Sequence, residues 1–93
     1  MKVNNGYVVK EIADKIVLIP AGQNVVDYKN MLYINETASF ILECMKEDIT
    51  KEELLNKMIK EYEAETDSDK AILEKDLDEF LNMAIEFGAV TKE

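Results

Sequence analysis

The sequence contains no His, no Trp and no Arg, and it has a single cysteine, Cys44. One cysteine cannot form an internal disulfide, and without His it cannot supply a zinc site, so we expect no metal, no cofactor and a cytoplasmic location. Long apolar runs are also absent. No run exceeds four residues, as in Ile16 to Ile19, whereas a membrane-spanning helix needs about 20. The sequence therefore predicts neither a membrane span nor a signal peptide.

The composition is that of one globular domain over residues 1–93. Of these 93 residues, 47% are hydrophobic and 33% are charged, which suffices for one compact core. The net charge is −9 and is uneven: residues 1–48 hold five Lys and seven acids (−2), and residues 49–93 hold six Lys and thirteen acids (−7). Phosphate backbones and anionic membranes repel such a chain. We therefore expect no nucleic-acid partner and no membrane partner.

The N-terminal third is rich in β-branched and aromatic residues in short runs, which is typical of strands. Ala13 and Asp14 leave room only for a tight turn between the first two runs, and Pro20 ends the second run because it has no N–H for a ladder. Lys29 and Asn30 separate another pair. The pattern predicts strands over 7–12, 15–19, 24–28 and 31–34.

After Asn35 the apolar spacing becomes helical, and it predicts helices over about 36–47, 51–63 and 69–87. Asn35 is the expected N-cap of the first helix, and Thr50 with Glu53 fits a capping box for the second. Asp67 or Ser68 is expected to cap the third, after a loop over 63–69.

The third helix carries a long apolar stripe, and Gly88 is expected to end it as a left-handed residue before a short tail over 89–90. Strands followed by helices in blocks indicate an α+β fold. We expect a small antiparallel N-terminal sheet of three to four strands packed on three helices, in a winged helix-turn-helix-like arrangement.

Catalysis finds little support in these residues. The carboxylates fall mostly at solvated helix positions, and Cys44 has no His or Arg nearby in sequence to lower its pKa, so we interpret it as a packing residue. The three glycines are 16 and 66 residues apart and form no phosphate loop. The sequence predicts a protein that is not an enzyme.

Two further motifs have structural explanations that we favour. Residues 67–69 (Asp-Ser-Asp) suggest a calcium loop or the modified serine of an acyl carrier protein. The Gly and Glu of a calcium loop are missing, however, and acyl carriers are all-helical.

A helix-turn-helix would place residues 70–87 in the major groove of DNA. Its outward positions are net acidic, with Glu74, Asp78 and Glu79 among them, which argues against DNA binding.

The strands have apolar residues on both faces, for example Tyr7 and Val9 against Val8 and Ile12. Two explanations stay open. Helices or a loop can wrap both faces of the sheet, or an edge strand and an apolar groove can be left open for an extended peptide.

The segments "YINETASFILECM", "ITKEELLNKMIKEY" and "DKAILEKDLDEFLNMAIEFGAV" resemble the PqqD-like proteins. These are also called RiPP recognition elements, and they act as peptide chaperones for ribosomally synthesised and post-translationally modified peptides. The most specific segments are residues 32–38, where a strand enters a capped helix, and Phe80-Leu81 with 87–90. The resemblance covers about residues 7–91 and contains core and cap residues without a catalytic signature.

The resemblance implies a three-stranded sheet on three helices, with a leader peptide added as an antiparallel strand beside the strand that precedes the first helix. Residues 31–34 match that strand, and the third helix forms the other wall of the groove. It also implies delivery to a modifying enzyme, often a radical S-adenosylmethionine maturase. The additional strand expected at 24–28 would either cover this edge or become the edge.

We therefore expect a non-catalytic module that binds the leader peptide of a modified precursor. Lys70 or Lys75 would meet leader acids at the rim. The alternative is a winged-helix-like module for protein interaction or homodimerisation without DNA binding. The residues expected to bind peptide are Val25, Val26, Tyr28, Met31, Leu32, Tyr33, Lys70, Leu73, Glu74, Leu77 and Leu81.

Overall fold

The structure is a computed structural model that describes residues 1–4, 6–20 and 31–91. The strand expected over 24–28, with Val25, Val26 and Tyr28, lies outside the described residues. The elements follow in the order β1 (Lys2–Val3), β2 (Tyr7–Ile12), β3 (Lys15–Pro20), β4 (Leu32–Ile34), α1 (Glu36–Cys44), α2 (Lys51–Glu61), α3 (Asp67–Phe87) and β5 (Val90–Thr91). This is the expected α+β class, with small antiparallel sheets and three helices.

The main sheet has the order β2-β3-β4, and both strand pairs are antiparallel. Ile12 pairs with Lys15, so the hairpin turn has two residues, Ala13 and Asp14, as the sequence predicts. Ala13 has a positive φ of 56°, which this type of tight turn requires. In the second pair, Ile16 lies opposite Ile34.

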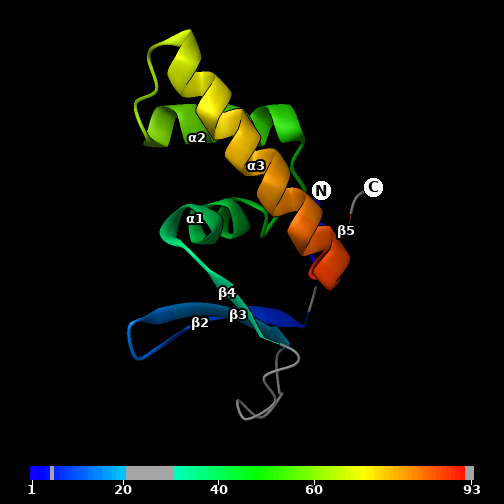
Figure 1. Cartoon of the computed structure of the whole chain (residues 1–93). Coiled ribbons are helices and arrows are strands. Elements are labelled where there is room, and N and C mark those ends of the chain that lie inside the picture. Colours follow the sequence, from blue (N-terminus) through cyan, green and yellow to red (C-terminus); the bar gives the residue numbers. More distant parts are fainter. Residues whose placement is uncertain (5, 21–30, 92–93) are drawn as a thin grey trace.

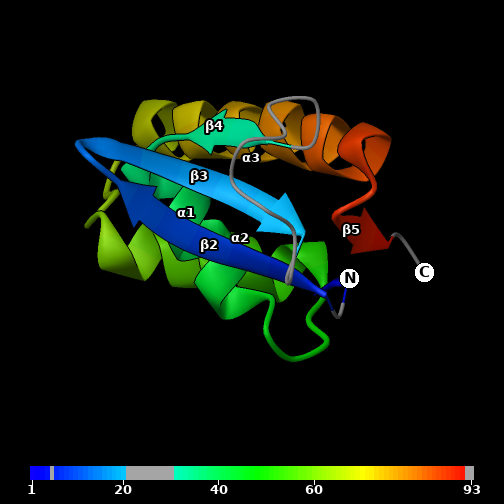
Figure 2. The same cartoon turned by 90° about the horizontal axis from the view of Figure 1, so that it is seen from below.

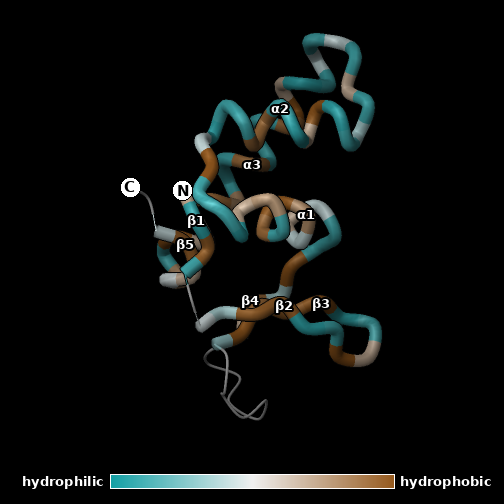
Figure 3. The backbone as a smooth tube through the Cα atoms, turned by 180° about the vertical axis from the view of Figure 1, so that it is seen from behind, coloured by the Kyte–Doolittle hydropathy of each residue, from teal (hydrophilic) through white to brown (hydrophobic). Residues whose placement is uncertain are grey.

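The helices lie on one side of this sheet, with α1 nearest to the strands and α2 and α3 beyond it (Figures 1 and 2). The strands themselves are largely hydrophobic (Figure 3). Leu18 of β3 joins the core with Ile41 of α1, Met58 of α2 and Leu77 of α3. Each of these side chains is at most 1% exposed, so the helix layer removes one sheet face from water. None of the described helices is long and apolar enough to cross a membrane.

Two of the predicted helix caps are confirmed, and the third lies elsewhere. The Asn35 side chain accepts a hydrogen bond from the Ala38 N–H at 2.8 Å, and Thr50 forms a capping box with Glu53. The third helix begins at Asp67 and not at 69, and its N-cap is Thr66 and not Asp67 or Ser68. The Thr66 hydroxyl accepts from the Asp69 N–H at 3.0 Å, and this bond fixes the first turn two residues earlier.

The first two helices are shorter than predicted, ending at Cys44 and Glu61 and not at about 47 and 63. At the end of α1, the Met45 N–H still bonds to helix carbonyls, but Met45 itself is no longer helical. An ion pair of 2.6 Å between Lys51 and Asp78 joins the start of α2 to α3.

The C-terminal segment is more ordered than the short tail that the sequence predicts. Gly88 ends α3 in the left-handed conformation, as expected, but Val90 and Thr91 then form β5. This strand pairs antiparallel with β1, so Val90 and Thr91 lie beside Val3 and Lys2. Asn4 strengthens the junction, because its backbone N–H donates to the Ala89 carbonyl at 2.7 Å.

Candidate functional site

β4 is an edge strand of the main sheet. It pairs with β3 on one side, and its other edge has no strand partner among residues 1–4, 6–20 and 31–91. Leu32 and Ile34 are half-buried and pack against the core, whereas Tyr33 is 59% exposed on the opposite face. An edge strand presents a row of backbone N–H and C=O groups to any chain that lies beside it.

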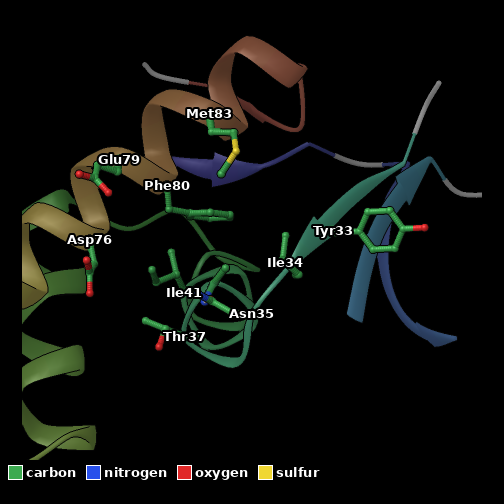
Figure 4. Close-up of a pocket in the computed structure, with 10 residues that line it drawn as sticks. Tyr33, Ile34, Asn35, Thr37, Ile41, Asp76, Glu79, Phe80 and Met83 are labelled. Carbon is green, nitrogen blue, oxygen red and sulfur yellow. The ribbon is translucent and has the colours of Figure 1, made fainter. Parts of the chain in front are cut away.

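A groove runs beside this strand, between β4, the start of α1 and α3. In Figure 4, Phe80 and Met83 of α3 point into the hollow from one side, whereas the Tyr33 ring lies beyond β4, away from α3. We call it the β4–α3 groove, and its lining residues are Tyr33, Ile34, Asn35, Thr37, Ala38, Ile41, Asp76, Glu79, Phe80 and Met83.

The α3 wall of the groove consists of Asp76, Glu79, Phe80 and Met83. Their spacing of i, i+3, i+4 and i+7 places them on one face of the helix. Phe80 is only 6% exposed and forms the floor, while Met83 is 45% exposed and available to a ligand. The wall is therefore apolar at its C-terminal end and acidic at its N-terminal end.

A second hollow continues from the first toward the β2–β3 turn. It shares Tyr33, Ile34 and Asn35 with the β4–α3 groove. The other residues that line it are Asp14, Lys15, Ile16 and Glu36. We call it the hairpin end of the groove. This second hollow lies where β4 leads into α1, next to the β3 residues that pair with β4.

The residues expected at the site fall into three groups in the structure. Tyr33 lines the groove, and Met31 and Leu32 lie half-buried next to it. The three leucines of the α3 stripe lie elsewhere: Leu77 and Leu81 are buried in the core, and Leu73 lines a separate hollow with Tyr62 and Ile72. The exposed residues Lys70 and Glu74 line neither part of the groove.

Sequence reasoning did not select Ile34, Asp76, Phe80 and Met83 as site residues. It chose the most continuous apolar stripe of α3, and that stripe faces the core. The signal for the groove was present in Met83, an apolar residue that lies outside the line of buried leucines and beside Phe80. An exposed methionine next to a core position is a common feature of binding surfaces.

The charged side chains that line the β4–α3 groove are Asp76 and Glu79, and both lie on its α3 wall. The other wall includes the first turn of α1, where the Ala38 N–H donates to the Asn35 side chain. Across the groove, Asp76 lies opposite Thr37, with Glu79 beside it on α3 (Figure 4). The described residues contain no cluster of three or more side chains that could hold a metal ion.

Cys44 lies at the end of α1, outside the groove, and is partly buried. Burial raises the pKa of its thiol, with the nearby Lys57 ammonium opposing this effect. A raised pKa means less thiolate at neutral pH, which fits a packing residue better than a nucleophile.

A strand edge beside a groove is the arrangement used by peptide-binding modules whose sheet is extended by a ligand strand. The family "Coenzyme PQQ synthesis protein D (PqqD)" matches residues 14–90, which is most of the chain. The chain therefore belongs to the PqqD family, as the resemblance in its sequence suggested. Members of this family are non-catalytic peptide-binding chaperones, which confirms the expectation of a protein that is not an enzyme.

A solved structure described as "TbiB1 in Complex with the TbiA(beta) Leader Peptide" is similar to the whole chain. The TM-score is 0.69, the sequence identity is 20%, and the match covers 100% of this chain and 98% of that one. At this identity the similarity establishes the fold alone, which is winged helix-turn-helix-like. Among curated proteins no match was found.

Proposed function

We propose that this chain binds the leader peptide of a ribosomally synthesised precursor, as an additional antiparallel strand beside β4. The observation that carries the proposal is the position of the β4 edge next to the β4–α3 groove. Two further facts support it. The PqqD family consists of peptide-binding chaperones, and TbiB1, which has the same fold, was solved with a leader peptide.

The two parts of this site would have different roles. Backbone hydrogen bonds to the β4 edge supply affinity for any extended chain, whatever its sequence. Alternate side chains of the ligand point to the same side of the sheet, so every second one enters the groove and meets Ile34, Phe80 and Met83. The remaining ones lie on the face of Tyr33. The groove therefore supplies the selectivity.

Binding alone would be the task of this chain, and chemistry would belong to a modifying enzyme. A radical S-adenosylmethionine maturase is the partner that the family resemblance implies. In this scheme the chain holds the leader, and the part of the precursor beyond the leader extends into the enzyme. A leader held by strand addition has a defined direction, and this direction fixes where the modified segment starts.

The test is a titration of isotope-labelled protein with leader peptides from short reading frames beside its gene. We expect backbone amide shifts in residues 32–38 and 76–83. Met83→Glu places a charge in the apolar part of the groove and should weaken binding by about tenfold or more, equivalent to about 1.4 kcal/mol. Ile72→Glu is the matched control, since Ile72 is exposed on the same helix but lies outside the groove.

The same titration distinguishes strand addition from docking of side chains alone. Peptides that are N-methylated at alternate backbone positions lose ladder donors but keep their side chains. One of the two alternating methylation patterns should abolish binding and the other should be tolerated, because only every second residue of a strand bonds to a given neighbour. Equal binding of Met83→Glu and Ile72→Glu, or tolerance of both methylation patterns, would contradict the proposal.

A second candidate, self-association, is favoured by the opposite edge of the sheet. β2 pairs only with β3 in the described part of the chain, and it exposes Val8, Val9 and Ile12. In an antiparallel pair of two β2 strands, one register places Lys10 opposite Glu11 of a second copy, and Val9 opposite its Ile12. Opposite charges and paired apolar residues both favour this register. It would form a dimer that leaves β4 free.

A further inference from the structure

The charges that line the peptide groove are predominantly acidic. The β4–α3 groove and its hairpin end contain five exposed charged residues, Asp14, Lys15, Glu36, Asp76 and Glu79. Four are carboxylates and one is an ammonium, so the local net charge is −3. Lys70 and Lys75, which the sequence suggested as partners for acidic leader residues, line neither hollow.

One feature of the groove, the N-terminus of α1, favours an acidic ligand. Its partial positive charge competes with the negative charge of the carboxylates that line the groove. The N-terminus of α1 carries a partial positive charge of about half an elementary charge. Glu36 lies in the first turn of this helix and Asn35 caps it, so much of that partial charge is already balanced. Asp76 and Glu79 each carry a full charge on the facing wall. The carboxylates therefore determine the sign of the potential in the groove.

The acidic and apolar parts of the α3 wall are spaced to match an extended peptide. Glu79 and Met83 are four residues apart, which is a rise of about 6 Å along the helix. Side chains two residues apart on a strand are separated by about 6.6 Å on the same face. A peptide that places an apolar side chain at Met83 therefore brings the side chain two residues away to Glu79, and Asp76 lies about one helical turn further along the same face.

The direction of the chain orders these two side chains. β4 runs toward the start of α1, and α3 runs beside it in the opposite sense in both views (Figures 1 and 2). A strand antiparallel to β4 then runs in the same direction as α3, from Asp76 toward Met83. The residue at the acidic end therefore comes first in the peptide, and the apolar residue follows two positions later.

We propose that the leader peptide taken by this groove carries a Lys or Arg two residues before an apolar anchor, with Asp76 and Glu79 as the residues that select the cation. This inference rests on the proposed function and adds the chemistry of the ligand to it. The net charge of −9 on the whole chain would also speed the approach of such a peptide.

The experiment is a selection of random twelve-residue peptides, displayed as a library, against the full chain. The same selection is run in parallel against three variants of the chain. They are Met83→Glu, the double variant Asp76→Lys/Glu79→Lys, and the control Glu61→Lys/Glu65→Lys. The control changes net charge by the same amount at exposed positions outside the groove. Peptides that bind the wild type but not Met83→Glu are those that occupy the groove.

Among these groove-dependent peptides we expect Lys or Arg to be enriched two residues before an apolar position. The enrichment should persist in the control and change to Asp or Glu in the Asp76→Lys/Glu79→Lys variant. In the most enriched peptide, replacing the cation by Glu should weaken binding to the wild type by about five- to tenfold, which is the range of one or two exposed charge pairs. The double variant should recover this loss.

The possible failures are distinguishable. Groove-dependent peptides with no charge preference, or with acidic residues at this position, would overturn the inference about the cation and leave the proposed function standing. If the control variant recovers the binding lost when the peptide cation is replaced by Glu, the inference about the cation also falls and the proposed function stands. Such a recovery would show an effect of net charge and not of Asp76 and Glu79. If every selected peptide binds Met83→Glu as well as the wild type, the groove is not a peptide site and both proposals fall.

Discussion

At the scale of single residues, Thr50 and Glu53 carry the clearest electrostatic signature in the structure. The Thr50 hydroxyl accepts from the Glu53 N–H at 3.1 Å, and the Glu53 carboxylate accepts from the Thr50 N–H at 3.2 Å. The backbone hydrogen bond from Thr50, followed by the bond from its side chain, holds the pKa of Glu53 below its ordinary value. A carboxyl with a lowered pKa in the folded state stabilises the fold at neutral pH.

The pH dependence follows from the direction of this shift. The stabilisation by Glu53 is fully present above the pKa of an unfolded glutamate, about 4.3, and is lost as the pH falls through the lower folded value. We predict that Thr50→Ala raises the pKa of Glu53 toward its ordinary value, as measured by NMR titration of the side-chain carboxyl.

The same substitution removes the N-cap and should lower the free energy of unfolding at pH 7 by about 1 kcal/mol. Thr50→Ser keeps the hydroxyl and is the control for both measurements. A pKa of Glu53 that is the same in Thr50→Ala, Thr50→Ser and the wild type would show that the capping box does not form in solution.

At the scale of elements, the sequence and the structure place the N-cap of α3 at different residues. The sequence suggested Asp67 or Ser68 as the cap, but the Thr66 hydroxyl makes the bond to the first turn. We predict that Thr66→Ala lowers the free energy of unfolding by about 1 kcal/mol, whereas Ser68→Ala, inside the helix, changes it by less than about 0.5 kcal/mol. Urea unfolding of both variants measures this. A larger loss for Ser68→Ala than for Thr66→Ala would move the cap to residue 68.

Elements with strong periodicity were predictable, and elements fixed by distant contacts were not. β2 and β3 are six-residue runs rich in β-branched residues, and the turn between them has only two residues, so the hairpin follows from local sequence. β1 and β5 have two residues each and pair Lys2 with Thr91. Two residues contain no period, and nothing local indicates a partner at the other end of the chain.

The candidate site was predictable in part for the same reason. β4 and its passage into a capped helix were visible in sequence, and they locate one wall of the groove. The resemblance also implied the third helix as the other wall, but it did not identify the residues of α3 that line the groove, because Asp76 and Glu79 resemble an ordinary solvated face. Leu77 and Leu81, the most apolar positions, are used by the core. Which face of an amphipathic helix borders a groove depends on the tilt of the helix against the sheet, and periodicity does not specify this tilt.

At the scale of the whole molecule, net charge separates the two candidate functions. A cationic peptide is attracted to a chain of charge −9, so salt weakens that complex by screening the attraction. Two copies of the chain repel each other, so salt relieves the repulsion and strengthens any contact between their β2 strands. The two Lys10–Glu11 pairs across such a contact would be weakened by salt, which reduces the gain in self-association. They do not reverse it, because two pairs are few against the net charge of each copy.

We therefore predict opposite salt dependences for the two processes. Between 50 and 500 mM NaCl, the affinity for a groove-binding peptide should fall, as measured by calorimetry, and sedimentation velocity should show more self-association at the higher salt. Val9→Lys, which places a charge on the β2 edge, should remove the self-association and leave peptide affinity unchanged. A mass of 10.7 kDa at both salt concentrations would eliminate the β2 dimer. Peptide binding that strengthens with salt would instead mean that apolar contacts, and not Asp76 and Glu79, dominate recognition.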